Sequence, residues 1–278
     1  MAINSLGNAL ASGTSSFATD EDPDLVREAV PFGLKTIESL LAESPRHKGL
    51  LFAAASGFTQ YAYAFLQQEA DLVEAQDLAK ATALRGRARR LFLRARDYGF
   101  RGLDLTLPGF EARLRKDPAS TLAGLKKEHV GMLYWTGAAW FAAISISKGD
   151  SELTADQQIA ERLLARALAL DETYELGAVH DFYISWEGRG EAVGGSPQKA
   201  REHFERAVAI SKGRRAWPYV SLAEAVSVPA QDRKEFDALL EKALAVDPNA
   251  APEVRLTNVI AQRRALWLKG RVEELFVE

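Results

Sequence analysis

The sequence contains no cysteine among its 278 residues. Disulfide bonds, a cysteine nucleophile and thiolate metal sites are therefore excluded. The sequence also lacks the Gly-x-Ser-x-Gly turn of many serine hydrolases and the Gly-Lys-Ser/Thr of a phosphate-binding loop. Its histidines have no metal-binding spacing; they are His47, His129, His180 and His203. The residues therefore indicate no metal and no cofactor, and they favour no common class of hydrolase.

An excess of positive charge is absent as well. The 35 Lys and Arg residues and 38 Asp and Glu residues give a formal net charge of −3. Because nucleic-acid binding needs a basic face, we expect no nucleic-acid partner.

Residues 1–22 have neither the basic nor the apolar part of a signal peptide. We expect residues 1–22 to be a flexible leader or short helix, followed by one helical domain over residues 23–278.

One stretch, SPQKAREHFERAVAIS at residues 196–211, contains every signal of an amphipathic helix. Ser196 can cap the first turn, and Pro197 suits the first helical position. One face carries a narrow apolar stripe, namely Ala200, Phe204, Ala207 and Val208. The opposite face offers two i,i+4 ion pairs, Arg201 with Glu205 and Glu202 with Arg206. So small a stripe predicts a helix that packs closely on similar helices.

Similar segments recur along the chain. When these segments are aligned, Ala167, Ala207 and Ala243 lie 40 and 36 residues apart, and Ala95 lies 72 residues before Ala167. Periods of this length are typical of stacked helical hairpins. We therefore predict an all-α protein, an α-solenoid of four or five degenerate tetratricopeptide-like hairpins with a C-terminal capping helix.

Proline and capping residues predict several helix boundaries. We expect Pro31 to interrupt a helix that starts at Pro23, and Thr154 with Gln157 to start a helix that ends at Leu170. An inner helix is expected over residues 174–186, and a long closing helix over residues 252–276.

Two long runs contain no charged residue, residues 49–68 and 130–147. The first would just span a bilayer, and the second has the same character. Polar residues within the first run and the dense charge that follows it favour inner helices of a superhelix over membrane spans. Such helices can either fill the core or enclose an apolar channel. The candidate channel residues on the inner helices are Phe58, Tyr61, Phe65, Tyr134, Trp135, Trp140, Phe141, Phe182, Tyr183 and Trp186.

Three polar features also allow more than one interpretation each. His180 beside Asp181 can be a buried hydrogen-bonding group or a ligand contact, and an acid–base pair of an enzyme is a less favoured third interpretation. Arg263 falls on the apolar face of the closing helix, where it is expected to be buried and to hold the cap or to meet a ligand anion. The glycine-rich residues 188–197 are interpreted as a turn between helices in preference to a phosphate site.

Several extended strings together resemble one family, the TatT family, the T component of tripartite ATP-independent periplasmic (TRAP) transporters. They begin at Asp22-Pro23 and include LLAESPRHKGLLFAAASGFTQYAYAF, WEGRGEAVGGSPQKAREHFERAVAIS, VPAQDRKEFDALLEKALAVDP and RLTNVIAQRRALWL. The resemblance implies a periplasmic lipoprotein of tetratricopeptide-like hairpins, a homotrimer that associates with a periplasmic solute-binding protein and has a hydrophobic passage in each subunit. It implies no catalytic residues.

The lipid-bearing cysteine of that family is absent from this sequence, which fits a form without its signal peptide and anchor. The expected function is therefore that of a non-enzymatic scaffold. We expect it to dock a solute-binding protein and to hold or pass a hydrophobic small molecule or lipid, and to meet a membrane only through the missing anchor. The alternative is an assembly module that binds no ligand.

Overall fold

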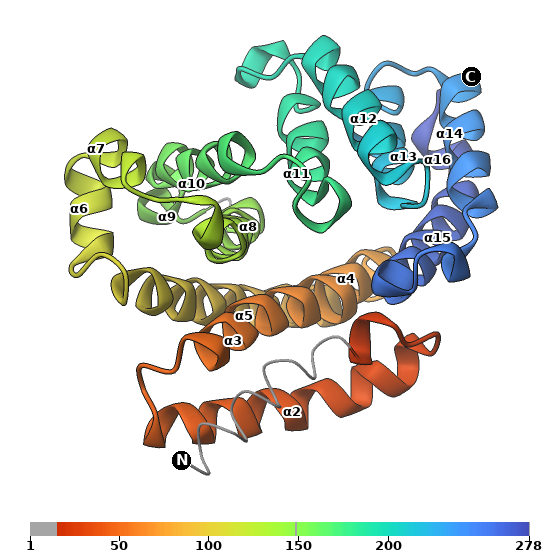
Figure 1. Ribbon diagram of the computed structural model, residues 1–278. Helices are drawn as coiled ribbons and strands as arrows, with labels where there is room; N and C mark the ends of the chain where they lie inside the picture. The colour runs from red at the N-terminus through yellow and green to blue at the C-terminus, as the bar shows by residue number, and fades with distance from the viewer. Residues whose placement is uncertain (1–15, 148, 278) are drawn as a thin grey trace. The chain divides into compact units, whose positions relative to one another are not determined.

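The computed structural model describes residues 16–147 and 149–277, and in these ranges it contains helices and no strands (Figure 1). The predicted all-α class is confirmed. None of the helices in the described ranges is both long and apolar enough to cross a membrane. The α-helices are α2 (Pro23–Glu43), α3 (Lys48–Tyr61), α4 (Gln68–Val73), α5 (Leu78–Asp104), α6 (Phe110–Lys116), α7 (Pro118–Ala123), α8 (Val130–Ser145), α9 (Ser151–Ala155), α10 (Gln157–Leu170), α11 (Ala178–Glu187), α12 (Pro197–Ser211), α13 (Trp217–Leu222), α14 (Arg233–Ala245), α15 (Arg255–Lys269) and α16 (Val272–Leu275).

Shorter helical segments of other types connect these helices. Two are π-helical, η1 (Ala62–Gln67) and η5 (Ala223–Ser227). The others are 3₁₀ turns: η2 (Lys127–His129), η3 (Tyr174–Leu176), η4 (Glu191–Val193), η6 (Pro248–Ala250) and η7 (Pro252–Val254). Because η1 follows α3 and leads into α4 without a break, the charge-free residues 49–68 form one continuous helical rod.

The chain packs as two compact units, and each is described by itself. Of the described residues, the N-terminal unit contains 24–147 and 149–171, and the C-terminal unit contains 16–23 and 172–277. The single domain expected over residues 23–278 stays a prediction, because a continuous solenoid can also divide in this way. Of the expected leader, residues 1–15 lie outside the described residues, and residues 16–18 are helical.

In the N-terminal unit, α5 packs against α3 and α8, and α8 packs against α10. Phe92, Leu133 and Leu163, one from each of α5, α8 and α10, are fully buried. Glycine permits the close approach of two of these helices. A Cβ atom on Gly99 of α5 would lie 2.1 Å from Oγ1 of Thr136 on α8, closer than real Cβ contacts. Burial of residues 49–61 of α3 and of α8 accounts for their lack of charge, since an unpaired charge inside the unit would be costly.

In the C-terminal unit, α11 packs against α12, and α13 packs against α14 and α15. The core of this unit includes Val220, Phe236, Leu240 and Leu268. Small residues lie at the contacts of the repeated segments, and Ala207 and Ala243 are fully buried there. These burial patterns agree with the role that the sequence assigns to alanine, which is to let neighbouring helices approach closely.

The helix predicted at residues 196–211 is confirmed as α12. The Ser196 hydroxyl accepts a hydrogen bond from the Lys199 amide at 3.3 Å, and Pro197 is the first helical residue. The two predicted i,i+4 ion pairs are wrong. Arg201 instead binds Glu235 at the start of α14, and Arg206 binds Glu172 before α11, since these carboxylates come from packed neighbouring segments.

Three other predicted boundaries are wrong. Pro31 lies inside the continuous helix α2, where apolar residues on both sides of it keep one helical register and are buried; these are Val26, Leu34, Ile37 and Leu41. Thr154 does not start a helix, because Asp150 caps α9 and α10 begins at Gln157. The closing segment is divided at Gly270 into α15 and α16.

The expected inner helix over residues 174–186 is shorter than predicted. Glu175 and Leu176 have positive φ angles of 45° and 56°, and Gly177 follows with a φ of 88°. Left-handed backbone cannot continue a right-handed helix, so the regular helix α11 begins only at Ala178.

Candidate functional site

The candidate channel residues of the N-terminal unit lie on α3, on the π-helical η1 and on α8. Five of them are buried: Phe58, Tyr61, Phe65, Trp135 and Trp140. Tyr134 and Phe141 are half-buried. Phe58 stacks on Tyr98 of α5 with ring centroids 6.1 Å apart, and Trp140 meets Phe100 edge-on at 5.2 Å. Phe58 and Trp140 therefore belong to the packed core of this unit.

The remaining candidates, Phe182, Tyr183 and Trp186, lie together on α11 in the C-terminal unit. Tyr183 is buried and stacks on the ring of His203, with centroids 4.8 Å apart. Phe182 and Trp186 are half-buried and stack on each other at 6.0 Å. The Arg189 guanidinium lies over the Trp186 ring. The structure thus places the ten aromatic residues in two separate groups, one in each unit.

His180 is buried, as one interpretation of the sequence predicts, and it pairs with another histidine. Its Nδ1 atom lies 2.9 Å from Nδ1 of His203 on α12, and its Nε2 atom lies 3.5 Å from a carboxylate oxygen of Glu172. Burial lowers the pKa of His180 to about 4, the charge of His203 adds to this effect, and Glu172 opposes it. Burial also lowers the pKa of His203. Near neutral pH, the two rings are therefore a neutral pair that shares one hydrogen bond.

Asp181 makes a different contact from its neighbour. Its carboxylate is hydrogen-bonded to the buried Arg215, which follows α12. Burial raises the pKa of the Asp181 carboxyl, and the Arg215 guanidinium opposes this shift. Because the two side chains have separate partners, the structure does not bring His180 and Asp181 together as an acid–base pair. The enzyme interpretation loses its geometric basis.

Arg263 is exposed, so its predicted burial is wrong. The next residue, Arg264, is the largely buried arginine of α15. Its guanidinium binds Glu224 at 2.6 Å and lies 4.2 Å from the centroid of the Trp267 ring. The predicted position of the buried arginine is wrong by one residue because the buried stripe of α15 runs through Ile260, Ala261, Ala265 and Leu268.

The glycine-rich residues 188–195 form a turn, as predicted. The backbone closes on itself through a 3.0 Å hydrogen bond from the Gly195 amide to the Gly190 carbonyl. Gly190 and Gly194 have φ angles of 91° and 81°, which favour glycine. Backbone geometry thus accounts for these glycines without a bound phosphate.

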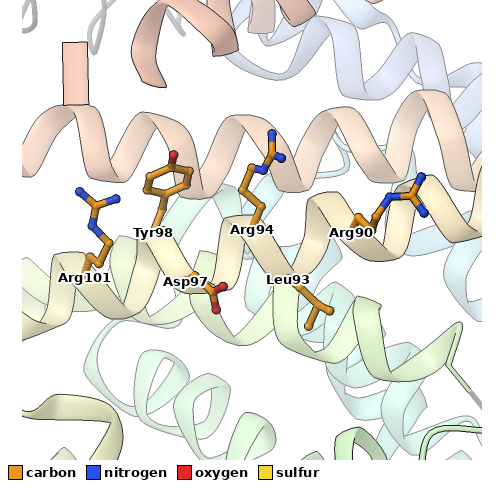
Figure 2. A pocket seen from close by; sticks show the side chains of 6 residues that line it. All are labelled: Arg90, Leu93, Arg94, Asp97, Tyr98 and Arg101. Carbon is orange, nitrogen blue, oxygen red and sulfur yellow. The ribbon is translucent and has the colours of Figure 1, made fainter. Parts of the chain in front are cut away.

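Sequence reasoning missed a groove of about 400 Å³ along α5. Six residues line it: Arg90, Leu93, Arg94, Asp97, Tyr98 and Arg101. Figure 2 shows Arg90, Arg94, Tyr98 and Arg101 on one side of the helix, with Leu93 and Asp97 on the other. A second hollow of about 420 Å³ shares Asp97 and Arg101 and extends toward Pro45 and Glu111. The signal for this site is the run of arginines between residues 85 and 101.

Neighbouring helices fix the aromatic and basic side chains of this groove. The Tyr98 hydroxyl donates to Glu38 of α2 at 2.9 Å, and burial together with this bond raises the pKa of Tyr98 to about 12. Burial alone would raise the pKa of Glu38, but hydrogen bonds from Lys35 and Tyr98 hold it below its usual value. The Arg94 guanidinium lies over the Phe58 ring at 5.4 Å, and that of Arg101 lies over Tyr98 at 5.1 Å. The groove therefore presents oriented arginines.

Comparison with known proteins gives two matches. A family model described as the TRAP transporter T-component matches residues 19–276. A protein of Treponema pallidum (strain Nichols), named as an uncharacterized protein, is 31% identical over 277 residues, which cover 96% of this chain and 84% of that protein.

Proposed function

The chain belongs to the TRAP transporter T-component family, and from this premise we propose that it is a periplasmic scaffold and binding protein. It docks a periplasmic solute-binding protein, and it holds or passes a hydrophobic ligand such as a lipid or an apolar organic acid. The observation that carries the proposal is the family match over residues 19–276, which spans nearly all of the described residues.

Regularly spaced ion pairs support the scaffold role. In the C-terminal unit, three ion pairs each join residues that are 34 positions apart: Asp181 with Arg215, Glu172 with Arg206, and Arg201 with Glu235. Thirty-four residues is the length of a tetratricopeptide repeat. The regular spacing supports a tetratricopeptide-like solenoid, in which α15 has the role of the capping helix.

The half-buried aromatic residues support the ligand-binding role. Tyr134 and Phe141 in one unit, and Phe182 and Trp186 in the other, are residues that remain partly exposed. Apolar ligand sites are lined mainly by such side chains. In addition, Phe65 lies in the π-helical η1, and π-helical turns are frequent at functional sites.

The alternative is an assembly module without a ligand, and one observation favours it. Phe58, Trp140 and Tyr183 make close ring contacts inside their own units, so core packing alone accounts for them. The two proposals differ in one measurable respect, which is whether an apolar molecule accompanies the purified protein.

Three further properties are proposed from the family resemblance. The native protein is attached to a membrane through a lipid anchor, it assembles as a homotrimer, and it has no enzymatic activity. The separate partners of His180 and Asp181 support the last of these.

Calorimetric titration tests the docking role. The probe is a periplasmic solute-binding protein of a TRAP transporter from the same organism. We expect a dissociation constant of about 10 μM or tighter. A binding protein from an unrelated transport system is the control, and no heat is expected from it. The absence of binding to every TRAP solute-binding protein of that organism would contradict the proposed function.

Mass spectrometry of solvent extracts tests the ligand role. We expect the purified chain to release an apolar compound that is absent from an extract of an unrelated helical protein. Trp186→Ala should lower the amount released, since its half-buried ring lies on the accessible side of α11. If extracts of the wild-type chain contain no such compound, the assembly module is the correct alternative.

A further inference from the structure

The helix α5 carries far more positive charge than the rest of the chain. Eight of its residues are Lys or Arg and two are Asp, whereas the whole chain has a net charge of −3. Several of the basic residues are neutralised: Arg85 binds Asp71 and Glu74, and Lys80 binds Glu69. Among the described residues, Arg87 and Arg90 have no ion pair or hydrogen bond, and both are exposed. The positive charge therefore remains unbalanced around the groove.

The acidic groups near the groove are already engaged. Asp97 pairs with Arg96 at 2.8 Å. Glu38 accepts hydrogen bonds from Lys35 and Tyr98 and lies 3.5 Å from Arg94. Arg101 shares the second hollow with Asp104 and Glu111, whereas no acidic side chain of the described residues forms an ion pair with Arg90.

The arginines are also oriented before any partner arrives. Arg94 is held over the Phe58 ring, while Arg101 lies over Tyr98 and donates to the Pro45 carbonyl at 3.1 Å. Planar guanidinium groups bind carboxylates in a bidentate way, and fixed side chains lose little entropy on binding. Arg90 and Arg94 are one helical turn apart, about 6 Å along the axis. This spacing suits carboxylates that a protein surface presents side by side.

We propose that the α5 groove is the surface on which an acidic face of the solute-binding partner docks. This inference rests on the proposed function and adds the location and charge of the contact. The open shape of the groove along one helix suits a protein surface better than a buried small molecule (Figure 2). Complementary charge speeds the association of two proteins, and salt screens this effect.

The test measures association rates between the full chain and a TRAP solute-binding protein from the same organism. Arg90→Glu should slow association about tenfold at low salt, because charges at the rim of an interface act mainly on the association rate. Arg90→Lys should retain most of the wild-type rate. The matched control is Arg162→Glu, an exposed arginine of α10 without an ion pair or hydrogen bond in the described residues, which should change the rate less than about twofold.

The outcomes distinguish the proposed function, which is docking of the partner, from the proposed location of docking at the α5 groove. If the wild-type chain binds and Arg90→Glu associates like Arg162→Glu, docking occurs elsewhere and the groove proposal is overturned while the proposed function stands. If the wild-type chain does not bind the partner, both fail. Vesicles of phosphatidylcholine and phosphatidylglycerol form a second arm. If Arg90→Glu weakens vesicle binding and leaves the protein association unchanged, the groove faces lipid and the proposal is wrong.

Discussion

At the scale of single residues, burial determines which polar groups stay neutral and which form ion pairs. His180 and His203 share one hydrogen bond next to the ion pair between Glu172 and Arg206. The sequence places a histidine beside an aspartate but cannot show their partners, because His203 lies 23 residues further along and Arg215 lies 34 residues beyond Asp181. Only the packing of α11 on α12 brings these groups together.

The histidine pair should make stability depend on pH. The folded-state pKa of His180 is about 4, below its ordinary value of 6.5, so the unfolded chain binds more protons between these pH values. The stabilising contribution of neutral His180 to the free energy of unfolding is fully present above about pH 6.5 and is lost as the pH falls toward 4. Urea unfolding at pH 7 and pH 4.5 should show a loss of about 2 kcal/mol that is much smaller in His180→Gln. An equal loss in both proteins would contradict the role of the pair.

Removing one side chain of the buried pair of Asp181 and Arg215 should lower the stability of the protein. Arg215→Ala leaves the buried carboxylate without its partner, and we expect the free energy of unfolding to fall by about 3 kcal/mol. Arg162→Ala, at an exposed arginine, should change it by less than about 0.5 kcal/mol. Urea denaturation of both variants measures the difference, and similar small effects would show that the ion pair contributes little.

At the scale of elements, helix ends with strong local signals could be predicted and those set by packing could not. The Ser196 cap and Pro197 fix the start of α12 from the sequence alone. Pro31 also gives a strong local signal, yet α2 continues through it because apolar residues on both sides are buried. The α5 groove was not predicted, since its shape depends on Glu38, Phe58 and Pro45 from other segments.

Close packing of α5 against α8 can be tested at a single glycine. In Gly99→Ala the new Cβ would approach Oγ1 of Thr136 to 2.1 Å, so the helices must separate. We expect a loss of about 2 kcal/mol in the free energy of unfolding. Gly33→Ala in α2 is the control, because no atom lies within 4 Å of its new Cβ, and it should be neutral or stabilising by up to about 1 kcal/mol. Equal effects of the two substitutions on the thermal midpoint would contradict this packing.

At the scale of the whole molecule, the all-α class and the family could be predicted from the sequence. The alanine spacing and the extended sequence strings can both be recognised without knowing which residues are in contact. The channel could not be established in the same way. Trp140 and Phe182 are both aromatic residues on predicted inner helices, yet Trp140 is fully buried and Phe182 is half-buried. Which aromatic rings meet a ligand depends on burial, which residue type alone does not determine.

The most direct test of the central claim, that this chain is the docking scaffold of a TRAP system, is native mass spectrometry of the chain mixed with a TRAP solute-binding protein from the same organism. We expect an assembly of three copies of the chain with bound partner, and an additional apolar mass that is released on activation. Spectra that contain only the separate chain and the separate binding protein, at concentrations well above 10 μM, would contradict it.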